Sequence, residues 1–347
     1  MSIFFVPPRH VIEEAAYFLW EKRGQVDGYD HADWIMAERA AVFQSNYEQV
    51  DWFEFVTPKR RYLGPNENRI CRFCGSTDPN KFKNDSHAIP QLLGNKSVIA
   101  RYECDDCNGY FSREIEDDLG KCLQGGRTVL GIRGSSGIPS YKTTSKQSRM
   151  DRKADRLDVK ETVGDRFTQI NPDKNQVIYT LKTQAFIPLA VYKSFAKIAL
   201  SLMPDDELQY FKHAIDFVMS PDHKADAADS KSANCYRFFV PGPFPNPYGW
   251  AALFKRRDDR GALPYMALVV ATANLVFQTF VPLCLRDVHL QGKTFRFPSF
   301  PAGYGRGYDY GETQFVGMKL SSPDRQTVGV KIDTRAETMT RTGADIR

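Results

Sequence analysis

The spacing of hydrophobic residues in the N-terminal segment predicts two helices. In residues 9–24, apolar side chains recur at helical spacing up to Gly24, which follows two basic residues in the way helix C-termini do. A second periodic stretch covers residues 32–55 after a short polar loop. The pattern therefore predicts a helical N-terminal domain over residues 1–56, and a linker containing Pro, Gly and basic residues over 57–70.

The second half of the chain predicts a mixture of strands and helices. Residues 157–183 alternate weakly between apolar and polar positions, which predicts two short strands. Residues 186–220 carry apolar residues at helical spacing, interrupted at Pro204, and predict two amphipathic helices. Further apolar runs, separated by Pro- and Gly-rich turns, predict antiparallel strands at 234–242, 249–257, 264–283 and 294–298. We therefore expect an α+β C-terminal domain over 157–322 and a polar tail over 323–347.

The overall composition is that of a globular protein. The chain has 347 residues, of which 42% are hydrophobic and 26% charged, and this length accommodates two or three domains. Polar residues interrupt the longest apolar stretch, so no membrane span is predicted. The N-terminus lacks the basic start of a signal peptide, and the cysteines fit a reduced, metal-binding set; both features predict a cytoplasmic protein.

Basic residues are concentrated in one Gly- and Ser-rich stretch, residues 125–156. This stretch holds eight Lys or Arg against two Asp, so it accounts for the net charge of +5 of the whole chain. A flexible basic arm of this kind suits electrostatic capture of a DNA phosphate backbone, and a solvated loop is the alternative. The residues expected to contact phosphates are Arg149, Arg152 and Lys153 in the arm and Arg60 and Arg61 in the linker.

Four of the seven cysteines predict a structural zinc site. They form two Cys-x-x-Cys pairs, Cys71/Cys74 and Cys104/Cys107, and two such pairs supply the four thiolates of a tetrahedral zinc site. The interval between the pairs leaves room for a β-hairpin, and apolar residues recur at helical spacing after the second pair. The pattern predicts a treble-clef-like ββα module over residues 71–124.

The residues enclosed by the cysteines suggest chemistry. His87 lies between the two pairs, and Asn108 directly follows the last cysteine. An imidazole on the hairpin, facing an amide or carboxylate on the helix, suits phosphodiester hydrolysis with one divalent metal ion. The histidine takes a proton from water, and the metal ion neutralises the scissile phosphate. Zinc held by four thiolates is coordinatively closed, so the catalytic ion has to be a second one.

The motif C-x2-C…SHAIP-x-x-LG…EC-x2-CN-x2-F-x4-E resembles the HNH (ββα-metal) endonuclease superfamily, specifically its members with Cys-x-x-Cys pairs. The resemblance implies that His87 is the general base and that Asn108 is a ligand of a catalytic Mg²⁺ or Mn²⁺ ion. That superfamily usually has Asp or Glu directly before the histidine, where this chain has Ser86, with Asp85 one residue earlier. Asp85 can replace the missing ligand only if the strand bulges or turns, because neighbouring residues of a strand point to opposite faces.

Two further features complete the expected site and its surroundings. Glu116, on the same helix as Asn108, is a further candidate ligand of the catalytic ion, a group behind the ligands, or a solvated surface residue. Residues 10–45 resemble a short bacterial helical domain of unknown function, which brings no chemistry with it. The shared positions are Ala16, Tyr17, Trp20, Glu21, Gly24, Gly28, Asp30, Trp34, Ala37 and Glu38.

Two functions are compatible with this sequence. One is a metal-dependent HNH endonuclease that hydrolyses DNA, for which the resemblance implies a bacterial or phage setting, in genome defence or in a mobile element. The alternative is a non-catalytic treble-clef zinc module that binds nucleic acid or protein. In both cases the N- or C-terminal domain provides a surface for a second copy or a partner protein. The endonuclease requires a carboxylate, at position 85 or 86, that is directed at the catalytic metal ion. The non-catalytic module requires none.

Overall fold

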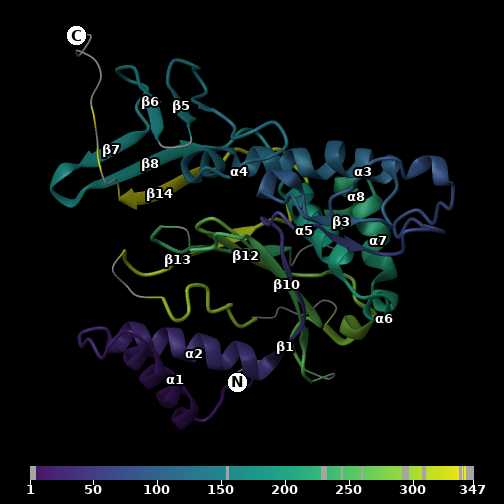
Figure 1. The fold of residues 1–347 in the computed structure, drawn as a ribbon, viewed down its shortest axis with the longest axis horizontal. Helices are drawn as coiled ribbons and strands as arrows, with labels where there is room; N and C mark the ends of the chain where they lie inside the picture. The colour runs from purple at the N-terminus through teal and green to yellow at the C-terminus, as the bar shows by residue number, and fades with distance from the viewer. Residues whose placement is uncertain are drawn as a thin grey trace.

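The computed structural model describes residues 5–153, 156–227, 233–243, 245–258, 261–290, 297–306, 310–335, 338 and 340. The predicted α+β class is confirmed, since helices accompany mainly antiparallel sheets. The centre is a six-stranded antiparallel sheet in the order β1-β10-β11-β12-β9-β13 (Figure 1). Its strands are β1 (Tyr47–Glu54), β9 (Asn234–Phe239), β10 (Trp250–Arg256), β11 (Met266–Thr272), β12 (Leu275–Phe280) and β13 (Gln314–Lys319).

The N-terminal helices form the expected hairpin, but the second helix is shorter than predicted. Helices α1 (Arg9–Lys22) and α2 (Asp30–Asn46) are joined by a buried ion pair between Arg23 and Asp33, 2.6 Å apart. The predicted helix over 32–55 is wrong beyond residue 46, where the chain enters strand β1. The spacing of apolar residues there is compatible with either state, and pairing with β10 decides in favour of the strand.

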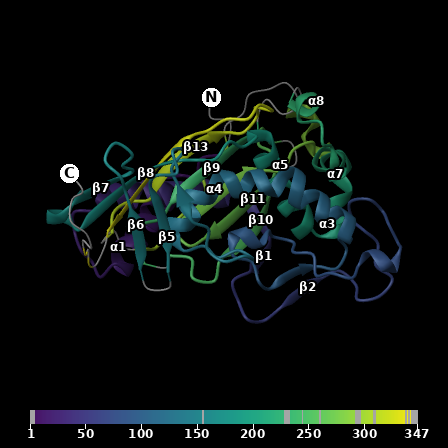
Figure 2. The ribbon, with the colours of Figure 1, turned by 90° about the horizontal axis from the view of Figure 1, so that it is seen from above.

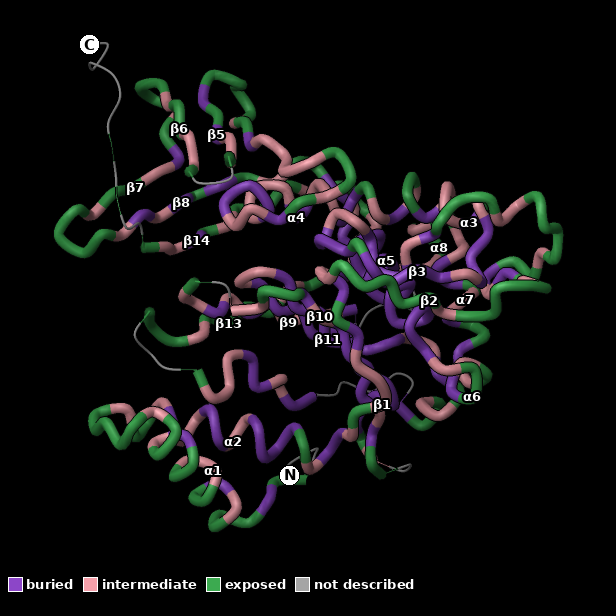
Figure 3. Tube along the Cα trace, in the orientation of Figure 1, coloured by how far each residue is buried: buried purple, intermediate pink, exposed green. Residues whose placement is uncertain are grey.

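The two faces of the central sheet pack against different layers. One face contacts α2 through Phe43, Phe238 and Phe254. The other is covered by α5 (Pro188–Leu202), in which every residue is buried. The prediction that this helix is amphipathic is therefore wrong, because it lies between the sheet and the zinc-site helices (Figure 3).

The remaining helices of the C-terminal region are α6 (Asp205–Leu208), α7 (Lys212–Met219) and α8 (His223–Ala227). No helix in the described part of the chain is long and apolar enough to cross a bilayer.

The predicted basic arm is structured in the described residues. Its start belongs to α4 (Asp117–Leu130), which ends at Gly131 with a positive φ of 72°. The rest contributes β4 (Tyr141–Lys142) and β5 (Arg149–Arg152), which form a small sheet with β6 (Leu157–Lys160). The prediction of a flexible arm is wrong there, because strand pairing and ion pairs to aspartates order it. Residues 154–155 lie outside the described residues.

The predicted polar tail also contains regular structure. Strand β14 (Gly329–Arg335) pairs with β8 (Gln176–Lys182), which in turn pairs with β7 (Thr168–Asn171). Ile332 is the buried residue of this strand, between exposed Lys331 and half-buried Asp333, and the polar composition of the segment did not reveal it. Residues 336–337, 339 and 341–347 of the tail lie outside the described residues, as do residues 294–296 of the strand predicted at 294–298. The division of the chain into domains remains a prediction.

Candidate metal centre and the His87 loop

The four predicted zinc ligands lie together at one end of the molecule. Cys71 and Cys74 lie in a tight turn closed by hydrogen bonds from Gly75 N to Cys71 O and from Cys71 N to Ser76 O, each 2.8 Å long. Cys104 precedes helix α3 (Asp105–Phe111), and Cys107 lies within it. Figure 2 shows α3 close to the long loops that hold β2 (Arg61–Leu63), at the end of the molecule opposite β7.

The sulfur atoms are spaced as zinc requires. All four Sγ atoms lie within 4.8 Å of one another, with Cys71–Cys107 at 3.7 Å and Cys74–Cys104 at 3.6 Å. Four sulfurs about 2.3 Å from a tetrahedral ion are separated by about 3.8 Å, so this donor set fits zinc. In the described ranges, no other group of three or more His, Cys, Asp or Glu side chains is close enough to share a metal ion.

The loop that carries His87 is a reduced form of the predicted hairpin. His87 makes a single antiparallel bridge with Ile99, flanked by hydrogen bonds from Ala88 N to Val98 O (3.2 Å) and from Ala100 N to Ser86 O (2.8 Å). Strand β3 (Val98–Ala100) instead pairs in parallel with β2 (Arg61–Leu63). The segment predicted as a linker therefore supplies a strand of the module.

A buried asparagine shapes the turn beyond His87. Asn95 Nδ2 donates to Ile89 O and Val98 O, and its Oδ1 accepts from Ser97 N and Val98 N, all within 3.0 Å. Gly94 precedes it with a φ of 99°, a conformation that glycine adopts without strain. These contacts hold the loop in one shape and thereby fix where His87 lies.

The imidazole of His87 is half-buried and electrically neutral at pH 7. Burial lowers its pKa, and the positive charges of Lys197 and Arg60 lower it further, against the opposing effect of Asp85. Nε2 lies 2.8 Å from the side-chain amide nitrogen of Gln91, whereas Nδ1 is buried without a hydrogen-bond partner among the described residues. A neutral ring with one nitrogen held and the other unpaired is suited to accepting a proton.

The side chains of Asp85 and Ser86, the two residues before His87, lie in different surroundings. Ser86 is buried, and its hydroxyl donates to Glu103 O at 3.1 Å, so its role is to join the loop to the second cysteine pair. Asp85 is exposed, and its carboxylate pairs with Arg60 at 2.7 Å. The structure thus places Asp85 on the outer side of the loop, bound to a cation of the chain.

The other two expected metal ligands lie on the helix that follows Cys104. Asn108 is half-buried in the first turn of α3, next to Cys107. Glu116 ends a π-helical turn, η3 (Ser112–Glu116), between α3 and α4. Its carboxylate faces the ammonium of Lys197 at 3.6 Å. The three segments form one continuous helical path from residue 105 to 130.

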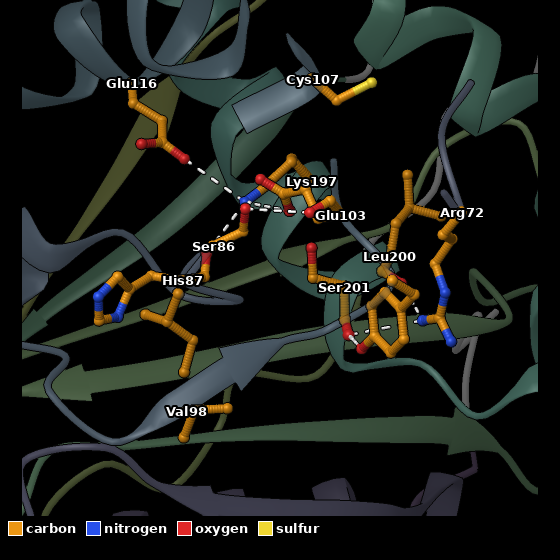
Figure 4. Close-up of polar contacts among 12 residues, drawn as sticks. Arg72, Ser86, His87, Val98, Glu103, Cys107, Glu116, Lys197, Leu200 and Ser201 are labelled. Atoms are coloured by element: carbon orange, nitrogen blue, oxygen red, sulfur yellow. Dashed lines mark hydrogen bonds and ion pairs between the residues drawn. The ribbon is translucent and has the colours of Figure 1, made fainter. Parts of the chain in front are cut away.

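Lys197 completes the site and was missed in the sequence. Its Nζ atom is fully buried on α5 and lies 3.0 Å from the Glu103 carboxylate, 3.6 Å from Glu116 and 3.1 Å from the His87 carbonyl oxygen. In Figure 4 the carboxylates converge on this ammonium, while the His87 ring points away from it. The available signal was a lysine in a mostly apolar helical run, which also holds Lys193, 110 residues from His87.

The cluster of Lys197, Glu103 and Glu116 keeps the lysine in its charged form. Burial opposes the ammonium form of Lys197, but the two carboxylates outweigh burial and raise its pKa. Burial raises the pKa of Glu103 to about 7 in spite of Lys197, and it raises the pKa of Glu116 as well. Lys197 therefore stays charged and ties the cysteine loop, the π turn and the His87 loop to α5.

The basic residues expected to contact phosphates are mostly engaged within the chain. Arg149 pairs with Asp151 at 2.6 Å, and Lys153 pairs with Asp158 at 2.9 Å. Arg152 donates to a carbonyl oxygen of α4 at 3.2 Å. The linker residues are likewise paired, Arg60 with Asp85 and Arg61 with Asp51. Arg60 is the member of this set whose charge acts on His87.

Two segments of the chain match known protein families. Residues 71–124 match the family model described as HNH endonuclease, which coincides with the zinc module and the His87 loop. Residues 10–41 match a family described as a protein of unknown function, DUF2934, which coincides with α1, the loop after it and most of α2. No curated protein and no solved structure matches the chain. Both resemblances predicted from the sequence are thus confirmed for these segments.

Proposed function

We propose that the module of residues 71–124 hydrolyses phosphodiester bonds of DNA, with His87 as the general base. The state of His87 is the observation that supports this most, because its ring is neutral and one nitrogen has no partner within the described residues. The match of these residues to the HNH endonuclease family supports the class of reaction.

Gln91 determines which ring nitrogen of His87 acts as the general base. Since Gln91 lies against Nε2, Nδ1 is the atom left to accept a proton, and the imidazole has to turn outward for the attacking water to reach this buried nitrogen. For this, Gln91 presents its amide oxygen to Nε2–H, which is the opposite amide orientation from the one in the structure, where the amide nitrogen lies 2.8 Å from Nε2. The proton moves from water to Nδ1, and the resulting hydroxide attacks the phosphorus atom.

Asn108 would hold the Mg²⁺ or Mn²⁺ ion through its side-chain oxygen, and Asp85 would join it on releasing Arg60. Such an ion keeps several waters and takes phosphate oxygens from the substrate, so it needs few protein ligands. When bound, it neutralises the scissile phosphate and stabilises the leaving oxygen. Glu116 would stay with Lys197 behind these ligands, and Arg60, freed from Asp85, would contact the adjacent phosphate. The role in bacterial genome defence rests on the resemblance to the superfamily alone.

The test is nicking of supercoiled plasmid by zinc-loaded protein with Mg²⁺ or Mn²⁺. His87→Ala should reduce the nicking rate by about 10²- to 10⁴-fold, the range expected for loss of a general base. His31→Ala, on the exposed side of α2, serves as the matched control and should cleave like the wild type. Absence of nicking by the wild type with either ion, or full activity of His87→Ala, would reject the proposal. DNA binding without nicking would favour the non-catalytic zinc module instead.

A further inference from the structure

A cavity lies beside the distal half of the helical path that begins at the zinc site. It has a volume of about 360 Å³ and is enclosed by α4 together with strands β8, β9, β12, β13 and β14. Its apolar walls include Leu123, Phe239 and Val316, and its charged lining residues are Arg237, Lys182, Lys331 and Asp333. Mostly apolar walls with a few polar groups, at a volume above about 300 Å³, are typical of small-molecule sites.

Arg237 is the unusual group in this cavity. It lies in β9 opposite Phe277 of β12 and Val316 of β13, and burial lowers the pKa of its guanidinium. Among the described residues, its side chain makes neither an ion pair nor a hydrogen bond. Asp333 is directed elsewhere, since its carboxylate accepts a 2.7 Å hydrogen bond from Gln176 Nε2.

The other groups near Arg237 do not supply a negative charge. They are the thiols of Cys122 and Cys235, both free and buried. Burial raises the pKa of Cys122 to about 12 and that of Cys235 still further, so both thiols stay neutral at physiological pH. Arg237 is half-buried, and a partly desolvated cation without a counter-charge is unfavourable, so an anionic ligand would provide the missing charge.

We propose that this cavity binds a small organic anion whose phosphate or carboxylate group pairs with Arg237 and whose apolar body lies against α4. A planar guanidinium holds either anionic group by two parallel hydrogen bonds. Lys182 and Lys331 are exposed at the rim and add positive charge along the entrance. Leu123 and Phe239 provide the surface for an aliphatic or aromatic body.

The position of the cavity connects it to the zinc module. Cys122 and Leu123 lie on the same continuous helical path that carries Cys107 and Asn108 at its other end. A ligand in the cavity therefore contacts the same continuous helical path that carries Asn108 of the candidate active site. An effect of the ligand on cleavage rests on the proposed function, whereas binding itself does not.

The experiment measures binding to full-length, zinc-loaded protein by calorimetry, without DNA or Mg²⁺, so that its outcome does not depend on nuclease activity. The probes are phenyl phosphate and benzoate, their neutral counterparts phenol and benzamide, and inorganic phosphate. We expect saturable binding of one or both aromatic anions, weaker binding of inorganic phosphate, and no binding of the neutral probes. Preference for phenyl phosphate or for benzoate identifies the anionic group.

Two variants make the assignment specific. Arg237→Met should weaken anion binding by about 10- to 100-fold, as expected on loss of a charge-assisted hydrogen-bond pair. Val316→Trp keeps the arginine and narrows the cavity next to it, and it should weaken binding of the aromatic anions. Zinc content and circular dichroism confirm that each variant is folded. The proposal is overturned if no anion binds the wild type at millimolar concentration, or if both variants bind as the wild type does.

Discussion

Two cations lie beside the same continuous helix, Lys197 fully buried and Arg237 half-buried, and their surroundings differ. Lys197, near its zinc-bearing half, faces two carboxylates and a backbone carbonyl oxygen. Arg237, near its other half, faces two neutral thiols and a cavity. The first cation completes a site from within the chain, and the second leaves a site that an outside anion can complete. The comparison shows that a cation inside the protein indicates a ligand site only where the chain itself supplies no negative charge for it.

Removal of zinc should have the largest effect, and it should affect the region around Lys197 but not the region around Arg237. Cys104→Ser, or a strong chelator, should release the metal and unfold the His87 loop, because structural zinc contributes on the order of 10 kcal/mol to folding. Glu103, a partner of Lys197, precedes Cys104 directly, whereas the walls around Arg237 include no zinc ligand. Hydrogen exchange should therefore rise at residues 86–100 and stay low in β9, which holds Arg237. Equal loss of protection in both segments would contradict this separation.

The comparison is sharpest when each cation is replaced by the same apolar residue. Lys197→Met leaves two buried carboxylates without a counter-charge, and it should lower the free energy of unfolding by about 3–5 kcal/mol. Arg237→Met removes an uncompensated charge, and it should change the ligand-free stability by no more than about 1 kcal/mol, in the stabilising direction. Urea denaturation measures both.

A rescue experiment identifies the cause of the Lys197 effect. Adding Glu103→Gln to Lys197→Met should recover part of the lost stability, because it removes one of the two carboxylates that have lost their counter-charge. If the double variant is less stable than Lys197→Met, the uncompensated carboxylates are not the cause.

A smaller effect concerns the pH dependence of His87. Because its pKa is lowered, the neutral imidazole persists below pH 6.5 and is lost only as the pH falls through the folded-state pKa. The acidic limb of the cleavage profile should therefore lie below pH 6.5. Gln91→Glu places a carboxylate where the amide now lies 2.8 Å from His87 Nε2, and it should move this limb to higher pH by about one unit. Gln91→Met, which carries no charge, is the control and should not raise the limb.

The smallest effect is expected on the basic surface. Arg149 and Lys153 already pair with aspartates on exposed strands, and such pairs contribute about 0–1 kcal/mol. Replacing both by Gln should weaken DNA binding only slightly and reduce the slope of log K against log salt by less than about 1, well below the value of about 1.8 expected for two lost phosphate contacts. A larger loss of slope would show that these residues leave their aspartates for phosphates. Arg60→Gln is the informative comparison, since this residue lies next to the His87 loop.

The sequence was most informative where the relevant contacts are short-range. The two Cys-x-x-Cys pairs, His87 and Asn108 stand close together along the chain, and metal coordination imposes the same geometry wherever such pairs occur. The helix after Cys104 was also predictable, because Phe111, Ile115 and Leu119 form a stripe that is buried in the structure.

The errors arose where distant segments decide the outcome. Residues 47–54 are a strand because β10, some 200 residues later, pairs with them. Strand β14 is ordered by β8 in the same way. Strand pairing over such separations depends on the packing of a whole layer, and the local pattern of a short polar or mixed segment does not reveal it.

By itself the sequence determined a four-cysteine zinc module with a histidine enclosed in it, because ligand spacing and helix periodicity are properties of neighbouring residues. The tertiary structure alone decided which charges meet. It brought Lys197 beneath the His87 loop, bound Asp85 to Arg60, and left Arg237 facing a cavity. The physical reason is that a charge acts through its partners and its solvation, and both depend on which distant segments the fold packs around it.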